Sequence, residues 1–195
     1  MLRNTLIAVL LLVIPTVIGA QSLDRYPPGT PVPVPRGQNQ TGTLPVPRHS
    51  VGSVAVGDRA PDFELERATG GRQRLSELRG GWTALWFGAH LTDLPDACAI
   101  AKELEKDEVT FVVVAAERAG RLRGWLEKNP TTAMLLSDAA CDIASEYGAF
   151  DAARGQPTCG LVVLDDKGIV RVAVVGHALP PGEAARMVQI AKTSL

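Results

Sequence analysis

Cysteine, histidine and aromatic residues are all scarce in this sequence. The chain of 195 residues contains three cysteines, three histidines and only 5% aromatic residues. No two of the cysteines, Cys98, Cys141 and Cys159, have the spacing of a metal-binding pair, and the histidines form no HxxxH pattern. Pairs of this kind are what a structural zinc site requires. We therefore expect no bound metal.

An excess of charge of either sign is also missing. Lysine and arginine number 20, and aspartate and glutamate number 21, which gives a net charge of -1. A nucleic-acid-binding domain usually carries a strongly basic face that attracts the phosphates, so we expect no nucleic-acid partner. The hydrophobic share of 46% and the charged share of 21% are those of a globular protein.

Long hydrophobic runs are absent too, because the apolar segment near the N-terminus is short. It extends over residues 6–18, follows Arg3 and precedes small residues that end at Ala20. A basic residue, a short apolar core and a small-residue cleavage site are typical of a secretory signal peptide. We predict that residues 1–20 are a signal cleaved after Ala20; the alternative is an uncleaved membrane anchor at residues 5–20. Both interpretations predict an exported protein, periplasmic or extracellular, and only the second predicts contact with a membrane.

Residues 21–53 contain little that could form a core. Seven prolines lie between residues 26 and 49, where they alternate with valine, glycine, threonine and glutamine. Such a composition keeps the backbone extended and prevents packing. We predict a flexible spacer over residues 21–53 and one folded domain over residues 54–195. A proline-rich ligand for a partner is the alternative interpretation of the spacer.

The folded part alternates between apolar runs and helical segments. Apolar or alternating runs predict strands at residues 60–66, 73–75, 82–87, 109–116, 134–136, 161–164 and 169–175. Amphipathic spacing, caps and breakers predict helices at residues 93–106, 121–128, 138–147 and 181–195, with a single helical turn at 76–81. This order predicts an α/β fold, in which helices cover both faces of a mixed sheet that ends in an antiparallel hairpin.

Four short segments of the folded part carry a family resemblance. They are VGDRAPDF at residues 56–63, LSELRG at 75–80, LLSD with ASEYG between 135 and 148, and GLVVLDDKG at 160–168. In this order they resemble the thioredoxin-fold redoxins of the alkyl hydroperoxide reductase/thiol-specific antioxidant group, to which the peroxiredoxins belong. The resemblance covers about residues 56–195. It implies a thioredoxin-like mixed sheet, antioxidant or thiol oxidoreductase activity, a peroxide or an unknown thiol/disulfide protein as partner, and no cofactor.

The same resemblance locates the reactive site and shows what has changed there. Peroxiredoxins carry a PxxxTxxC loop, in which the threonine and a remote arginine polarise a peroxide against the cysteine thiolate. The corresponding residues here are Gly88, Thr92 and Pro95, so the threonine is kept while the proline and the cysteine are replaced. The CxxC pair of thioredoxins is absent as well, because Pro95 also stands three residues before Cys98. The residues alone therefore leave both an active and an inactive redoxin open.

Cys98 is the candidate reactive thiol, with two interpretations. It stands three residues from the family position, which is less than one helical turn. It also shares one helical face with Leu94, Ala97, Ala101 and Leu104, where a cysteine packs as a small hydrophobic residue. We favour the packed interpretation, in which Cys98 points towards the core.

Cys159 is the candidate resolving thiol or disulfide partner. It stands where the family has its arginine, and the family fold would bring it towards the start of the helix that carries Cys98. Three cysteines in an oxidising compartment allow one disulfide, for which Cys98–Cys159 is the preferred pairing. Cys141 is the alternative resolving thiol, and Arg154 is the nearby guanidinium that would replace the missing arginine.

Two further features belong to the candidate site. Thr92 would either give polar support to a bound peroxide or cap the following helix. Pro157 and Thr158 resemble the cis-proline and threonine that face the reactive sulfur in thioredoxins, with the isomer of Pro157 left open. Two hypotheses result. One is an exported redoxin that performs thiol-disulfide or peroxide chemistry with an atypically placed cysteine, and the other is a redoxin-fold binding or structural module without catalysis.

Overall fold

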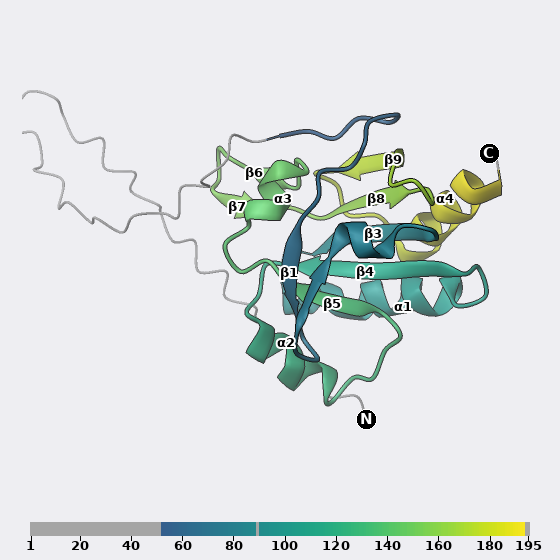
Figure 1. Cartoon of the computed structure of the whole chain (residues 1–195). Coiled ribbons are helices and arrows are strands. Elements are labelled where there is room, and N and C mark those ends of the chain that lie inside the picture. Colours follow the sequence, from purple (N-terminus) through teal and green to yellow (C-terminus); the bar gives the residue numbers. More distant parts are fainter. Residues whose placement is uncertain (1–51, 89, 194–195) are drawn as a thin grey trace, which may run out of the picture. The chain divides into compact units, whose positions relative to one another are not determined.

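The computed structural model describes residues 52–88 and 90–193 of the chain (Figure 1). The predicted signal peptide or anchor, and the predicted spacer up to residue 51, lie outside the described residues. Within the described ranges, no helix combines the length and the apolar composition needed to cross a membrane.

Seven strands form one mixed sheet in the order β2-β1-β5-β4-β3-β8-β9. The strands are β1 (Glu64–Arg67), β2 (Arg72–Arg74), β3 (Trp82–Gly88), β4 (Val109–Ala115), β5 (Met134–Ser137), β8 (Gly160–Leu164) and β9 (Val170–Val175). The central strands β3, β4 and β5 are parallel, and every other pairing in the sheet is antiparallel. The predicted α/β fold with a mixed sheet and a final antiparallel hairpin is therefore confirmed.

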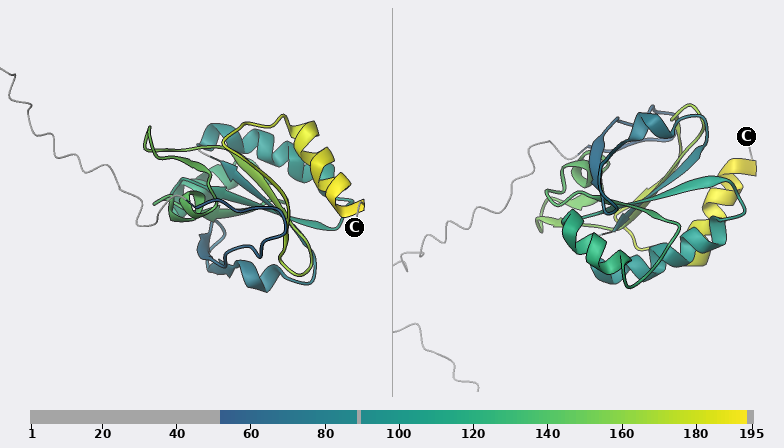
Figure 2. Two further views of the ribbon diagram at one scale, coloured as in Figure 1. Left: turned by 90° about the horizontal axis from the view of Figure 1, so that it is seen from above. Right: turned by 60° about the horizontal axis from the view of Figure 1, so that its bottom comes forward.

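Helices cover both faces of this sheet. They are η1 (Leu75–Leu78), η2 (Leu91–Asp93), α1 (Leu94–Leu104), α2 (Ala119–Leu126), α3 (Asp142–Glu146) and α4 (Pro181–Thr193). Apolar side chains of α1, α2 and α4 form one buried cluster with one face of the sheet, and those of α3 and η1 belong to a second cluster on the other face. Figure 2 shows α1 and α4 together on the same side of the sheet.

Strand β3 shows why the sheet is buried on both sides. Ala84 and Trp86 belong to the cluster under α1 and α4, whereas Leu85 and Phe87 belong to the other cluster. Because successive side chains of a strand point to opposite faces, a strand that is covered on both sides must be apolar throughout. This requirement explains the apolar run Ala84–Phe87 of β3, with Thr83 as the one buried polar residue of the strand.

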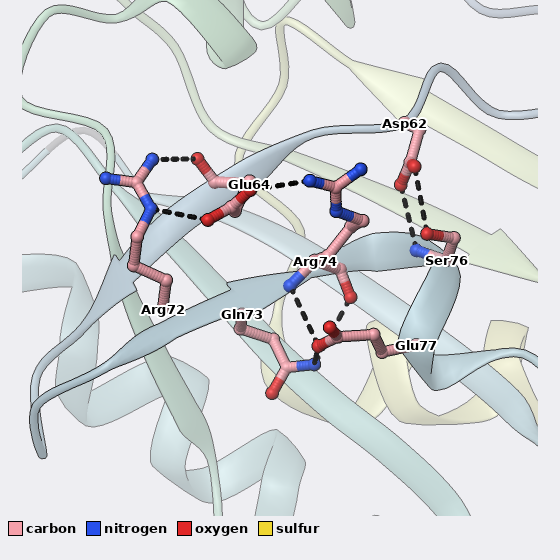
Figure 3. A network of polar contacts seen from close by, with 7 residues as sticks. All are labelled: Asp62, Glu64, Arg72, Gln73, Arg74, Ser76 and Glu77. Atoms are coloured by element: carbon pink, nitrogen blue, oxygen red, sulfur yellow. Dashed lines mark hydrogen bonds and ion pairs between the residues drawn. The ribbon is translucent and has the colours of Figure 1, made fainter.

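The β1–β2 hairpin at the sheet edge is held by charged side chains (Figure 3). Glu64 accepts hydrogen bonds from Arg72 at 2.7 Å and from Arg74 at 2.8 Å. Asp62 accepts from both the backbone N–H and the hydroxyl of Ser76, at 2.8 and 2.9 Å. A charged edge strand resists pairing with other chains, so this network both fixes the hairpin and protects the edge of the sheet.

Two local predictions need correction. Helix α3 begins at Asp142 rather than at residue 138, because Cys141 adopts a left-handed backbone with φ 59° and breaks the helical path. Asp138 caps α3 from a distance, since its carboxylate accepts the N–H groups of Ile143 and Ala144. A two-stranded hairpin of β6 (Phe150–Asp151) and β7 (Gln156–Pro157), which was not predicted, precedes Cys159.

Candidate functional site

The candidate site lies where β3 ends and α1 begins. Strand β3 ends at Gly88, the short helix η2 follows, and Pro95 lies in the first turn of α1. Proline is tolerated there because the first N–H groups of a helix have no acceptor within the helix. The structure therefore puts an exposed proline ring, which has neither a thiol nor an N–H, in the first turn of this helix.

Asp93 is the centre of the polar contacts in this site. One carboxylate oxygen accepts the backbone N–H of His90 at 2.8 Å, and the other accepts the hydroxyl of Thr92 at 3.3 Å. The thiol of Cys159 lies 3.9 Å from the first of these oxygens. A carboxylate is favourable at the positive end of a helix. The contact of Asp93 with Cys159 was not predicted, because no local pattern in the sequence signals it.

The register of the sheet explains why Cys159 reaches this position. Strands β3 and β8 are antiparallel and pair Phe87 with Gly160, so the residue before β8 lies beside the end of β3. A Cβ atom at Gly88 would lie 3.8 Å from the indole nitrogen of Trp86 and 3.9 Å from the Cβ of Asp93. That indole N–H is buried and has no hydrogen-bond partner among the described residues. The site therefore combines Trp86, Asp93 and Cys159 around a glycine.

Cys98 lies elsewhere on α1. Leu94, Ala97, Ala101 and Leu104 are buried, as the helical spacing predicted. Cys98 is only partly buried, and it lies at the margin of this apolar face. A difference of five positions from the N-cap residue of α1 corresponds to a rotation of about 140° around the helix axis, so Cys98 faces a different neighbour from the site residue Asp93.

The neighbour of Cys98 is a surface pocket of about 660 Å³ between α1 and the segment before β5. Its lining includes Cys98, Pro95 and Lys102 from α1, and Pro130 and Thr131 from the facing segment. Lys102 follows Cys98 by four positions, which places both side chains on one side of the helix. Cys98 therefore lines a surface pocket outside the site around Asp93, which differs from the favoured interpretation that its side chain packs towards the core.

The three cysteines are not joined by a disulfide. The preferred Cys98–Cys159 pairing is therefore not formed in this structure, where the two thiols have different neighbours. Cys141 packs at the start of α3, and burial together with the charges of Asp138 and Asp142 raises its pKa to about 11. Because the thiolate is the nucleophile, such a thiol is almost unreactive at neutral pH.

The remaining candidates have local roles. Arg154 pairs with Asp151 at 3.6 Å in the hairpin that precedes Cys159. The peptide bond before Pro157 is trans, since the described part of the chain contains no cis bond. Among the described residues, no group of three or more histidine, cysteine, aspartate or glutamate side chains has the geometry to hold a metal ion.

The chain matches a known protein family over most of its folded part. The model of the AhpC/TSA family matches residues 56–173. The chain belongs to the AhpC/TSA family. This assignment confirms the resemblance to the peroxiredoxin-like redoxins, whereas the place of Pro95 at the reactive-cysteine position of the family motif stays a prediction from the sequence.

Solved structures agree with the assignment. The peroxidoxin BcpB from Mycobacterium tuberculosis is 22% identical, with a TM-score of 0.63 over 73% of this chain and 98% of its own. A thiol peroxidase from Chromobacterium violaceum is 13% identical, with a TM-score of 0.61 over 75% and 93% of the two chains. AhpC from Enterococcus faecalis is 16% identical, with a TM-score of 0.62 over 72% and 93%. At these identities the likeness confirms the thioredoxin-like fold.

Proposed function

We propose that this AhpC/TSA-family domain is exported, has lost the cysteine-dependent reduction of peroxides, and serves as a binding or structural module. The observation that carries the proposal is the content of the first turn of α1. Pro95 stands where the resemblance puts the thiol of the family motif, and the carboxylate of Asp93 lies at the N-cap position of the same helix. The retained Thr92 donates its hydroxyl to Asp93, so it is engaged by a carboxylate instead of a peroxide oxygen.

The other thiols do not replace the missing one. Thiolate formation is unfavourable at Cys141, whose pKa is raised to about 11. Cys159 lies against the carboxylate of Asp93 at 3.9 Å, and a second negative charge at that distance is opposed by Coulomb repulsion. Arg154, the guanidinium predicted to replace the family's arginine, pairs with Asp151 and not with Asp93. Export is supported by the signal-like composition of residues 1–20.

The decisive experiment measures the consumption of hydrogen peroxide by the full chain with dithiothreitol as electron donor. We expect the wild type to match a Cys98→Ser/Cys159→Ser double variant, with both at the rate of the donor alone. The proposal fails if the wild type consumes peroxide faster than the double variant. The single variants would then identify the reacting thiol, and Cys141→Ser serves as the matched control for a cysteine of high pKa.

A second candidate function is thiol-disulfide exchange at Cys98, favoured by its place in the pocket that contains Lys102. In this reaction the Cys98 thiolate attacks a disulfide RSSR, one S–S bond forms as another breaks, and RS⁻ leaves and takes up the proton lost by Cys98. A different thiol, R′SH, would release Cys98 by attacking the outer sulfur of the mixed disulfide, which forms RSSR′ and returns a proton to the Cys98 thiolate. An external thiol is needed because Cys141 and Cys159 have other neighbours.

This candidate is tested by alkylation of the reduced native protein with iodoacetamide, followed by mass mapping. We expect Cys98 to be modified well before Cys141 if the pocket admits reagents. A Cys98 that reacts only after unfolding would remove this function altogether. A fast alkylation without any disulfide reductase activity would leave the binding-module proposal standing.

A further inference from the structure

A second pocket, of about 250 Å³, lies between the β1–β2 turn and the segment that leads into β5. Arg67 and Thr69 come from the end of β1 and the turn, and Thr131 comes from the facing segment. Leu126, Ala133 and Leu135 supply an apolar part of the lining. Thr132 also lines the pocket, which thus combines one guanidinium and three hydroxyl groups with an apolar surface, away from the site at the start of α1.

Arg67 differs from the other arginines of its hairpin. Arg72 and Arg74 both pair with the carboxylate of Glu64 (Figure 3). The side chain of Arg67 makes no hydrogen bond or ion pair with any described residue, and its Nε–H is buried. A buried N–H of a charged group is costly without an acceptor. A ligand oxygen in the pocket would provide that acceptor.

The neighbouring groups indicate what kind of ligand this would be. The hydroxyl oxygen of Thr131 accepts the backbone N–H of Ala133 at 3.2 Å, so its own proton can be donated into the pocket. Arg123 of α2 donates its Nε–H to the carbonyl oxygen of Ala68, a lining residue, at 3.0 Å, and so adds positive charge nearby. Thr132, which lines both pockets, donates its hydroxyl to Glu105 at 3.4 Å, and Glu105 itself lines the Cys98 pocket but not this one.

We propose that this pocket binds a small organic carboxylate. Its two oxygens would accept from the guanidinium of Arg67, which matches the planar, two-pronged geometry of a carboxylate. The hydroxyl of Thr131 would donate to one of these oxygens, and a short apolar body would contact Leu126 and Leu135. One guanidinium with an apolar lining suits a singly charged ligand better than a phosphate, which usually takes several cationic or N–H donors. The proposal does not depend on the fate of the redox site.

The test is an NMR titration of the ¹⁵N-labelled full chain with butyrate and benzoate, and with butyramide, benzamide and inorganic phosphate as comparison ligands. We expect saturable shifts at residues 67–69 and 131–135 with a carboxylate, and none with the amides. Arg67→Gln should weaken carboxylate binding by about tenfold or more, since it removes a charged, bidentate donor. Arg72→Gln is the matched control on the same hairpin and should leave the affinity unchanged.

A milder variant keeps the proposal testable if Arg67→Gln does not fold. Thr131→Val should weaken carboxylate binding by about threefold, because it removes one hydrogen bond to the ligand. The proposal is overturned if neither carboxylate gives saturable shifts at these residues, or if phosphate alone does. It is equally overturned if a folded Arg67→Gln protein binds the carboxylates as the wild type does.

Discussion

Two helices of this chain, α1 and α3, begin beside an aspartate and a cysteine, and the two arrangements differ. At α3, the buried carboxylate of Asp138 accepts N–H groups of the helix itself, and Cys141 is held next to it. At α1, Asp93 accepts the N–H of His90, which precedes the helix, and contacts Cys159 from another strand. Among the described residues, no side chain accepts an N–H group from the first turn of α1.

The N-terminal ends of α1 and α3 therefore differ in whether a carboxylate binds their N–H groups. The start of α3 is closed, because its N–H groups are already bonded to a carboxylate that the core surrounds. The start of α1 keeps its positive end available, although the residues around it no longer include the thiol of the family motif. The start of α1 therefore carries a carboxylate and a proline ring but no thiol, whereas the start of α3 has a structural role.

The largest effect is expected from removing the cap of α3. Asp138→Ala leaves the N–H groups of Ile143 and Ala144 without an acceptor in a buried place, so we expect a loss of about 2 kcal/mol in the free energy of unfolding. Asp138→Asn retains an acceptor oxygen and should lose clearly less. Urea unfolding of the wild type and the two variants measures these losses in the free energy of unfolding. Equal stability of wild type and Asp138→Ala would contradict the view that Asp138 stabilises the start of α3 by accepting its N–H groups.

The second prediction restores a thiol at the start of α1. Pro95→Cys recreates the family cysteine and a CxxC pair with Cys98, and the open helix end should stabilise its thiolate. We expect disulfide reductase activity at least about tenfold above wild type. Adding Asp93→Asn should raise it further, because a negative charge beside the thiol is removed.

Insulin reduction with dithiothreitol as donor measures this gain. Glu103→Cys is the matched control, since it adds an exposed thiol to the same helix far from its start. Activity in both variants would show that any added thiol suffices. Inertness of the folded Pro95→Cys protein would mean that the loop before α1 no longer has the redoxin path.

The sequence predicts the features that depend on neighbouring residues, and it does not predict those that depend on residues far apart in the chain. The parallel strands and α1 follow from local patterns, such as the apolar run of β3 and the spacing of Leu94, Ala97 and Ala101. The late start of α3 could not be predicted, because no pattern signals a left-handed Cys141. The contact between Asp93 and Cys159 joins residues that are 66 positions apart, and only the register of β3 with β8 determines it.

The third prediction uses pH to examine the start of α3. The pKa of the Cys141 thiol is raised from 9.0 to about 11 by burial and by the two neighbouring carboxylates. Because the folded-state pKa is the higher one, the protonated thiol contributes fully to stability below pH 9, and this contribution is lost as the pH rises towards 11. We expect the wild type to lose about 1 kcal/mol more than Cys141→Ala over this range, a figure lowered for partial exposure.

Urea unfolding under reducing conditions, repeated from pH 8 to pH 11, provides the measurement. Near pH 8 the free energies of unfolding of the two proteins should change with pH in the same way. Towards pH 11 the wild type should lose stability faster than Cys141→Ala. Parallel curves over the whole range would show that Cys141 ionises as easily in the native state as in the unfolded chain.

The smallest effect is expected from the carboxylate at the start of α1. Asp93→Asn keeps a side-chain oxygen for the N–H of His90, so the free energy of unfolding should change by less than about 0.5 kcal/mol. The charge beside Cys159 is lost, however, and this thiol should react with iodoacetamide about threefold faster at pH 8. Asp96→Asn removes an equal charge from the same first turn without a hydrogen bond to Cys159, and should change the rate much less. Equal acceleration in both variants would assign the effect to the field of the helix end as a whole, and the contact between Asp93 and Cys159 would then have no separate influence on the thiol.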